Sequence, residues 1–208
     1  SKLTIPVLLA ASSLHQHLIR EGLRTKVSII VNSAEVREVH HFATLIGFGV
    51  DAIHPYLAYA VVAQAIDNGH ISIPFEKAVQ KFQKGMAEGV VKVMSKMGIS
   101  TVQSYRGAQV FEAVGIGNEV IEKHFTGTAS QIDGIDLATI EEEARRKLQL
   151  ALESHEAELE SGSDFQWRAN GEHHAFNPKT IHTLQWATRK NDYGLYRMYA
   201  EMANEERI

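Results

Sequence analysis

The sequence predicts an α/β protein built from parallel βαβ units. Three short apolar runs begin near residues 5, 27 and 50, and the stretch after each of the first two has helical spacing. An interval of about 22 residues suits a strand, a helix and their connecting turns. Strands joined in this way run parallel through right-handed crossovers and are covered on both faces. We therefore expect three parallel strands in one sheet, an arrangement that resembles part of a TIM-like barrel.

The first two predicted strands are residues 5–10 and 27–31, and the second is rich in β-branched residues. Between them, Ser12 or Ser13 can cap a helix that Gly22 ends. A second helix follows, because residues 32–35 resemble a capping box and the next apolar residues line one helical face. These apolar residues are Val36, Val39, Ala43 and Ile46.

The third predicted strand covers residues 50–53 and is followed by a helix over 57–66. The longest periodic element spans residues 75–97, where apolar residues recur at steps of three and four. A fourth strand is predicted at 99–103, and a helix at 106–114.

The chain changes character after residue 135, which divides it into a parallel α/β domain (1–135) and a C-terminal extension (136–208). The extension begins with a charged, largely exposed helix from Asp136. A β-hairpin is predicted at 165–176, because Asn170-Gly171 is the dipeptide most favoured in two-residue hairpin turns. Two more helices follow, one opened by Asn177-Pro178 and one lined by Leu195, Met198 and Met202.

The composition bounds the function. The 208 residues carry a formal charge of −4, with 44% hydrophobic and 22% charged residues, which is typical of globular proteins and does not favour nucleic acid as a partner. No apolar run approaches the roughly 18 residues that a membrane span needs, and no secretory signal opens the sequence. We expect no membrane and a cytoplasmic location. There are no cysteines, which excludes disulfides and thiolate metal sites within these residues.

The familiar motifs of catalysis are not present in the sequence. Three histidine pairs, beginning at His15, His40 and His173, have spacings of one or two residues, which do not suit a metal site on a helix. The sequence has no Gly-x-Ser-x-Gly elbow and no nucleotide-binding glycine loop. The segment 126–130 is interpreted as a turn rather than a phosphate site. No metal and no catalytic residue is predicted.

The segment 96–109 is chemically the most pointed part of the chain. Polar residues follow the strand predicted at 99–103, and the carboxyl ends of parallel strands commonly meet ligands or neighbouring domains. In the alternative interpretation, Ser104 caps a helix and Arg106 makes a structural ion pair. The candidate interdomain or ligand-facing residues are Lys96, Gln103, Ser104, Tyr105, Arg106 and Gln109.

The same segment carries a family resemblance. The run from Lys92 to Gly115, which includes Met97-Gly98-Ile99-Ser100-Thr101-Val102-Gln103-Ser104-Tyr105-Arg106-Gly107-Ala108-Gln109, resembles the central region of glutamate synthase large subunits. Residues 18–24, 38–43 and 124–128 are similar to the same family in the same order, as is the predicted hairpin. The resemblance spans nearly the whole chain.

The resemblance implies a segment of a larger enzyme that converts glutamine and 2-oxoglutarate into two glutamates. In that family an amidotransferase domain releases ammonia, which reaches a barrel that holds FMN and a 3Fe-4S cluster. The central domain connects the two, so the amidotransferase and FMN-binding domains are expected partners in the same polypeptide. An electron-donating subunit or ferredoxin is a further expected partner. We expect the isolated chain to bind no cofactor and to be inactive.

Two alternatives follow from the residues. One is a stand-alone interaction module of a split glutamate synthase, which genomic neighbours would distinguish. The other is a small phosphate-binding α/β enzyme, which a ligand bound between Gln103 and Arg106 would favour.

Overall fold

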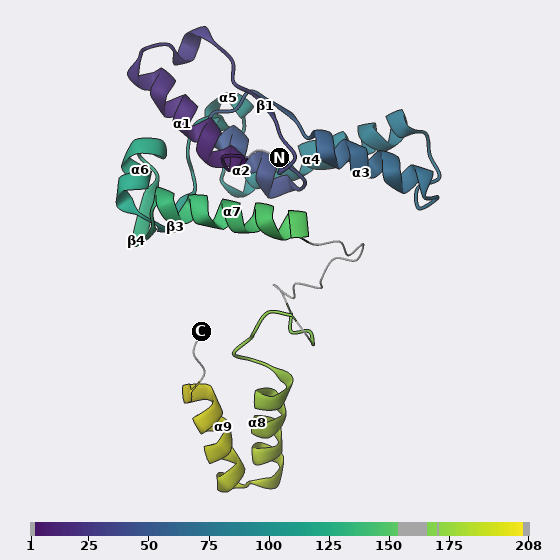
Figure 1. The fold of residues 1–208 in the computed structure, drawn as a ribbon, viewed down its shortest axis with the longest axis vertical. Helices are drawn as coiled ribbons and strands as arrows, with labels where there is room; N and C mark the ends of the chain where they lie inside the picture. Colours follow the sequence, from purple (N-terminus) through teal and green to yellow (C-terminus); the bar gives the residue numbers. More distant parts are fainter. Residues whose placement is uncertain (1–2, 154–165, 170, 206–208) are drawn as a thin grey trace. The chain divides into compact units, whose positions relative to one another are not determined.

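The computed structural model describes residues 3–153, 166–169 and 171–205. The chain forms two compact units, Ser1–Glu153 and Ser154–Ile208 (Figure 1). The first unit combines helices and short strands, and the second contains a pair of helices. The division predicted after residue 135 concerns the domains of a longer protein and stays a prediction.

The first unit contains helices and short strands in alternation. In chain order they are α1 (Val7–Arg20), the 3-10 helix η1 (Arg24–Lys26), β1 (Ile30–Asn32), α2 (Val39–Gly47), β2 (Ala52–His54), α3 (Tyr56–Asp67), α4 (Phe75–Lys96), α5 (Val102–Tyr105), β3 (Glu112–Ile116), α6 (Asn118–His124), β4 (Ala129–Ile135) and α7 (Leu137–Glu153).

One predicted βαβ unit is confirmed. Strand β1 pairs with β2 in parallel, with Val31 opposite Ile53, and α2 forms the crossover between them. Helix α2 starts later than predicted, since Glu38 and His41 form its capping box.

The first predicted strand is wrong, because residues 7–10 are the start of α1. Four or five consecutive apolar residues suit a buried helix as well as a strand, and Pro6 stands at the N-cap position. The side of α1 that carries Ala11, Ser12, His15 and Gln16 is buried. The expected three-stranded sheet is therefore a two-stranded one.

The predicted strand at 99–103 and helix at 106–114 are also wrong. The Thr101 side chain accepts a hydrogen bond from the Ser104 backbone N–H at 3.2 Å and so caps the short helix α5. The chain then extends into β3, which pairs in parallel with β4. The two strand pairs belong to separate sheets, which does not confirm a barrel-like arrangement.

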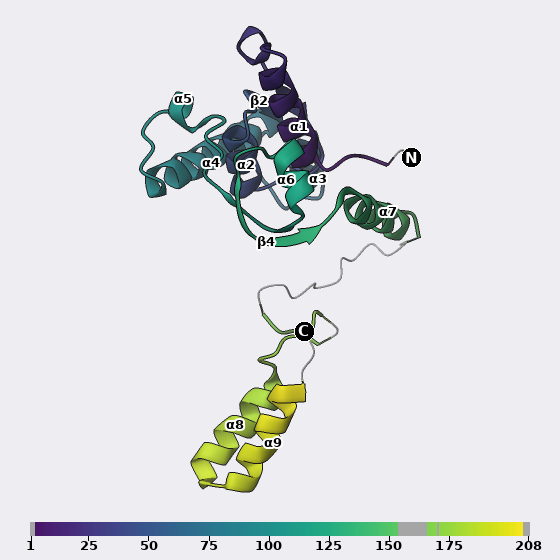
Figure 2. The same cartoon turned by 90° about the vertical axis from the view of Figure 1, so that its left-hand side faces the viewer.

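Helix α6 connects β3 to β4 and lies beside β4 (Figure 2). The sequence interpretation missed α6 and both of these strands. The turn expected at 126–130 is present at its start, where the Thr128 N–H donates to the carbonyl of Phe125 at 2.9 Å, but Ala129 and Ser130 already belong to β4.

The long helices agree with their periodicity. Helices α4 and α7 lie where apolar residues recur every three or four positions, and α3 covers the helix predicted at 57–66, although it is apolar over most of its length. Helix α4 ends before Gly98, whose φ of +72° is the left-handed conformation that favours glycine after a helix.

The core of the first unit consists of three clusters around α2. One joins α1, β1 and α2 through Val36 and Leu45, and a second joins α2, α4 and α5 through Ala43 and Tyr105. The third packs Phe48 against α6 and Phe125. Because Tyr105 is fully buried, its hydroxyl needs an acceptor, and it donates to the Ala43 carbonyl at 2.7 Å.

The second unit is a pair of helices, α8 (Pro178–Lys190) and α9 (Tyr193–Glu205), as predicted. Asn177 caps α8 and Asn191 ends it in the left-handed conformation, with φ of 50°. Residues 166–169 and 171–177 contain no strand, so the predicted hairpin does not form among these described residues. Its positions Phe165 and Asn170 lie outside them.

Among the described residues, no helix combines the length and apolar character that crossing a membrane requires.

Two glycines of α4 give a matched test of the α2–α4 packing. A Cβ on Gly89 would lie 2.3 Å from a methyl carbon of Val39 on α2, whereas a Cβ on Gly85 would meet nothing within 4 Å. We predict that Gly85→Ala stabilises the chain by up to about 1 kcal/mol, and that Gly89→Ala destabilises it by about 1–3 kcal/mol. Denaturant unfolding of both variants checks this. Equal effects of the two substitutions would contradict the close α2–α4 contact.

Candidate functional site

A polar cluster centred on Asp51 holds two of the predicted site residues. Asp51 lies immediately before β2, and its side chain is only 13% exposed. Its Oδ2 accepts from the Ile29 backbone N–H at 2.7 Å and from Arg24 Nη2 at 3.1 Å, and its Oδ1 accepts from Arg106 Nη1. One carboxylate therefore ties together segments that lie up to 55 residues apart in the sequence.

The Arg24 side chain donates hydrogen bonds to three further groups besides Asp51. Its guanidinium also donates to the carbonyl of Val27 at 2.9 Å and to the carbonyl of Gly49 at 2.5 Å. Its Nε donates to Nδ1 of His15 at 2.9 Å, so the neutral ring of His15 carries its proton on Nε2. Gly49, with φ of +100°, lies so close to this ring that a Cβ would stand 2.1 Å from Nδ1. Both this φ value and the nearby ring exclude a side chain, so only glycine fits at position 49.

The electrostatics of the cluster favour a negative Asp51 and a neutral His15. Burial raises the pKa of Asp51, but the Ile29 N–H together with Arg24 and Arg106 outweigh it, so the net pKa lies below the ordinary value of 3.8. For His15, burial and then the charge of Arg24 lower the pKa below 6.5, while Asp51 opposes this. The cluster is thus a charged hydrogen-bond network that holds segments together, and Asp51 and His15 are not a pair that exchanges a proton.

Arg106 connects the α5 segment to this joint. Its Nη2 donates to Oε1 of Gln103 at 2.9 Å, one helical turn earlier, and its side chain is 35% exposed. The following backbone is fixed as well, because the N–H of Gly107 donates to the carbonyl of Ile46 at 3.1 Å. The segment therefore stands against the end of α2.

Gln109 forms a second hydrogen-bond network that connects distant segments. Its φ of 53° is uncommon for a residue other than glycine. Its Nε2 donates to the carbonyl of Thr126 at 3.0 Å and to Oγ1 of Thr128 at 3.1 Å, and its Oε1 accepts from buried Gln16 at 3.2 Å. These bonds link α1, the segment before β3 and the turn before β4.

The other predicted site residues, Ser104, Tyr105 and Lys96, take no part in the hydrogen bonds of the Asp51 cluster. Ser104 is exposed and its hydroxyl accepts from the hydroxyl of Thr101 at 2.8 Å, so Thr101 rather than Ser104 is the helix cap. Tyr105 does not face the surface as predicted but is buried in the core, where burial raises the pKa of its hydroxyl. Lys96 is exposed at the end of α4. The ion pair of the alternative interpretation is present, between Arg106 and Asp51.

The sequence did not identify four residues of these two hydrogen-bond networks: His15, Gln16, Arg24 and Asp51. A weak signal existed for Asp51, a charged residue beside an apolar strand, since such a residue needs a partner once it is buried. Nothing in the spacing of the chain identifies its partners.

A separate pair of contacts attaches the end of α6 to α1. Ser12 Oγ donates to the carbonyl of His124 at 2.6 Å, and Ser13 Oγ lies 2.8 Å from His124 Nδ1. Burial, and then the charges of Lys123 and Arg20, lower the pKa of His124.

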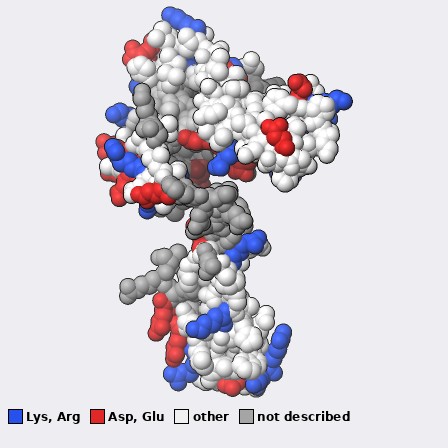
Figure 3. All heavy atoms as spheres, turned by 45° about the vertical axis from the view of Figure 1, so that its right-hand side comes forward, with Lys and Arg blue, Asp and Glu red and all other residues white. Residues whose placement is uncertain are grey.

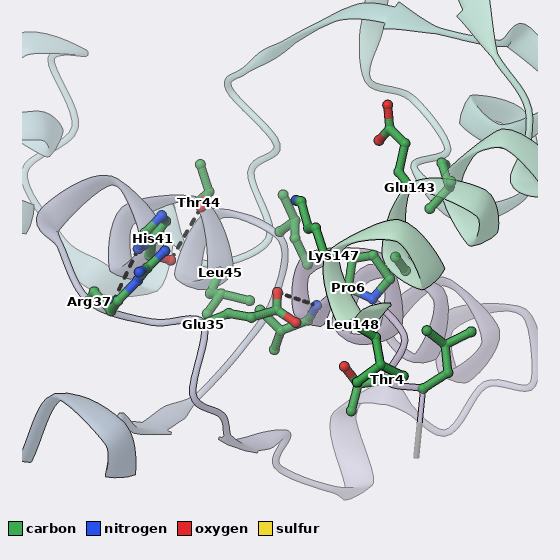
Figure 4. Close-up of a pocket in the computed structure, with 15 residues that line it drawn as sticks. Thr4, Pro6, Glu35, Arg37, His41, Thr44, Leu45, Glu143, Lys147 and Leu148 are labelled. Atoms are coloured by element: carbon green, nitrogen blue, oxygen red, sulfur yellow. Dashed lines mark hydrogen bonds between the residues drawn. The ribbon is translucent and has the colours of Figure 1, made fainter. Parts of the chain in front are cut away.

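The first unit has a pocket of about 640 Å³ between the chain before α1, α2 and α7 (Figure 4). Glu35 lines it and accepts from the first N–H of α1, on Val7, at 3.0 Å, a favourable place for a carboxylate. His41 also lines it, with Nδ1 accepting from the backbone N–H of Arg37 at 3.1 Å. These polar groups serve the ends of α1 and α2.

Among the described ranges, no three histidine or carboxylate side chains gather closely enough to hold a metal ion. Positive and negative side chains are interspersed on the face of the first unit in Figure 3. The geometry therefore defines a class: an α/β domain whose conspicuous polar residues hold its own segments together.

Comparison with known proteins gives the family. Residues 1–117 match the model of the glutamate synthase central domain, and the chain belongs to this family. It is 68% identical over 205 residues to the large chain of an NADPH glutamate synthase from Bacillus subtilis (strain 168), covering 98% of this chain and 14% of that protein.

Two less similar relatives are named for different electron donors, NADPH in one and ferredoxin in the other. The chain is 36% identical to the large chain of an NADPH glutamate synthase from Azospirillum brasilense, over 99% of this chain and 14% of the relative. It is 40% identical to ferredoxin-dependent glutamate synthase 2, chloroplastic, from Arabidopsis thaliana, over 95% of this chain and 13% of the relative. The chain thus spans about a seventh of the length of these proteins.

The lowered pKa of His15 predicts an acid-sensitive fold. Because its folded pKa lies below the ordinary 6.5, the unfolded state takes up the proton first, so stability is complete above about pH 6.5 and falls as the pH falls further. Denaturant unfolding between pH 7.5 and 5 should show this loss. His15→Asn, which keeps an acceptor for Arg24 but cannot titrate, should reduce the slope, and His124 supplies the remainder.

The control for this prediction is His70→Asn, an exposed position outside the cluster. It should retain the slope of the unchanged chain. An identical slope in the His15→Asn variant would contradict the prediction.

Proposed function

We propose that this chain is the central connecting segment of a glutamate synthase large chain, between an amidotransferase domain and an FMN-binding domain. The family match over residues 1–117 and the coverage of 14% of the relatives support this proposal. The full protein would convert glutamine and 2-oxoglutarate into two glutamates. The segment would contribute no catalytic residue of its own.

The observation that carries this proposal is that the Asp51 carboxylate is occupied by hydrogen bonds from its own chain. A catalytic carboxylate needs a free face toward a substrate, but Asp51 accepts from two guanidinium groups and one backbone N–H. Its partners fix the α5 segment and leave Gln103 and Ser104 exposed beside it. This arrangement supports a role in holding a surface in place for a neighbouring domain.

The cofactors of the family would be held elsewhere. Iron–sulfur clusters are ligated by cysteine thiolates, and this chain has none, so its residues do not fit the 3Fe-4S cluster. We also assign FMN to the barrel outside these residues and propose that residues 136–208 lead toward it. A ferredoxin or an electron-donating subunit would act on those other parts, and the location would be cytoplasmic.

The phosphate-binding alternative gains no support from the segment 126–130. Thr126 Oγ1 donates to the carbonyl of Glu122 at 2.7 Å, and Thr128 accepts from Gln109. A split-gene module would have the same geometry as a domain of a continuous chain, so the parent reading frame distinguishes those two.

Arg106→Ala in the full-length large chain tests the proposal. We expect less glutamate formed per glutamine consumed, because the α5 surface loses its attachment, while each half reaction stays measurable. In the 208-residue chain the same change should cost at most about 1 kcal/mol, since the side chain is partly exposed and Asp51 keeps Arg24.

Arg145→Ala serves as the matched control, because Arg145 pairs only with Glu141 on the exposed side of α7 among the interactions seen. It should leave the ratio of glutamate to glutamine unchanged. If Arg106→Ala also leaves that ratio unchanged, the connecting role of this surface is wrong.

A further inference from the structure

The pocket between the chain before α1, α2 and α7 has charged groups that the helix ends do not use. Its volume of about 640 Å³ lies within the range of small-molecule sites, about 300–1,000 Å³. Glu35 and His41 accept hydrogen bonds from backbone N–H groups. Three further charged side chains also line the pocket (Figure 4), and they have no such role: Arg37, Glu143 and Lys147.

The walls beside these charges are apolar. On α7, Ile140, Ala144 and Leu148 recur every four residues and are all half-buried, so they form one row along the pocket. Leu45 of α2 lines the pocket too, although its side chain is almost fully buried, and Leu8 adds an apolar group from α1. An apolar group that fills such a hollow removes this surface from water, which is favourable. The pocket therefore suits a ligand with an apolar body.

Glu143 and Lys147 are free to contact a ligand. A glutamate four residues before a lysine is well placed for an ion pair on a helix, and Glu141 pairs with Arg145 in this way on α7. Within residues 3–153, however, neither Glu143 nor Lys147 makes an ion pair or a side-chain hydrogen bond. Figure 4 shows the Glu143 carboxylate pointing away from Lys147. One turn of α7 therefore presents an unpaired anion and an unpaired cation beside the apolar row.

The balance of charge in the pocket selects the class of ligand. Arg37 and Lys147 are positive, and Glu35 and Glu143 are negative. A ligand with a charge of one sign would meet a like charge there, whereas a zwitterion finds an opposite charge for each of its groups. In a free α-amino acid the ammonium and the carboxylate are attached to the same carbon. They can therefore contact two side chains one helical turn apart, whose Cβ atoms lie about 5–6 Å from each other.

We propose that this pocket binds a free α-amino acid with a large apolar side chain. Lys147 contacts the carboxylate of the ligand and Glu143 its ammonium group, while the ligand side chain covers the apolar row of α7. Arg37 adds positive charge from the side of α2. The inference goes beyond the connecting role, because the pocket shares no lining residue with the Asp51 cluster.

Photoaffinity labelling of the full-length large chain tests the pocket. The probe is photo-leucine, a free α-amino acid that carries a diazirine in an apolar side chain. The protein is irradiated with the probe, and the labelled peptides are identified by mass spectrometry. We expect label within residues 35–45 or 140–148, which include the lining from α2 and α7. Absence of label from both segments would overturn the proposal.

Competitors separate the chemical features of the ligand. An excess of L-leucine should suppress labelling of these two segments. Isocaproate lacks the ammonium group, isoamylamine lacks the carboxylate, and glycine lacks the apolar side chain. Each of these three should compete at least about tenfold more weakly than L-leucine, a ratio that corresponds to about 1.4 kcal/mol. If any of the three competes as well as L-leucine, the assignment of the ligand class is wrong.

Lys147→Gln and Arg146→Gln form a matched pair of variants. Both remove one positive charge from an exposed position of α7, but only Lys147 lines the pocket. Lys147→Gln should reduce labelling about three- to fivefold, the ratio that an exposed charge contact of up to about 1 kcal/mol produces. Arg146→Gln should leave labelling unchanged. Equal labelling of the two variants would contradict the role of Lys147 and overturn the proposed site.

Discussion

The structure of the first unit depends on the need to satisfy one nearly buried carboxylate. Removing a charge from water costs several kcal/mol unless opposite charges and hydrogen bonds replace the water. Asp51 obtains them from the Ile29 N–H, Arg24 and Arg106. Each partner comes from a different segment, so the start of β2, the turn after α1 and the α5 segment must meet at one point.

This constraint has consequences for the surfaces nearby. With Arg106 on Asp51 and Gln109 on the turn before β4, the segment between them is anchored at two places. Tyr105 immediately precedes the first of these anchors, and its buried ring packs in the core between α2 and α4. The exposed residues of α5, Val102 among them, are therefore held on a packed support, which suits a surface that binds a neighbouring domain.

Part of this architecture was predictable from sequence because it is local. Long periodic helices such as α4 fold by their apolar spacing, and Asn177-Pro178 marks the start of α8. The strand expected at residues 5–10 failed because a short apolar run has no period, and that at 99–103 failed because Thr101 caps a helical turn. The pairing of Arg106 with Asp51 joins residues 55 positions apart, which no periodicity of the chain encodes.

The free energy of unfolding of Asp51→Asn, compared with that of Arg106→Gln in the 208-residue chain, tests the central position of Asp51 most directly. Asp51→Asn removes the charge from both guanidinium groups and should cost about 3 kcal/mol or more. Arg106→Gln leaves Asp51 with Arg24 and the Ile29 N–H, so it should cost at most about 1 kcal/mol. Equal losses in the two variants, or a loss below about 1 kcal/mol for Asp51→Asn, would contradict the account.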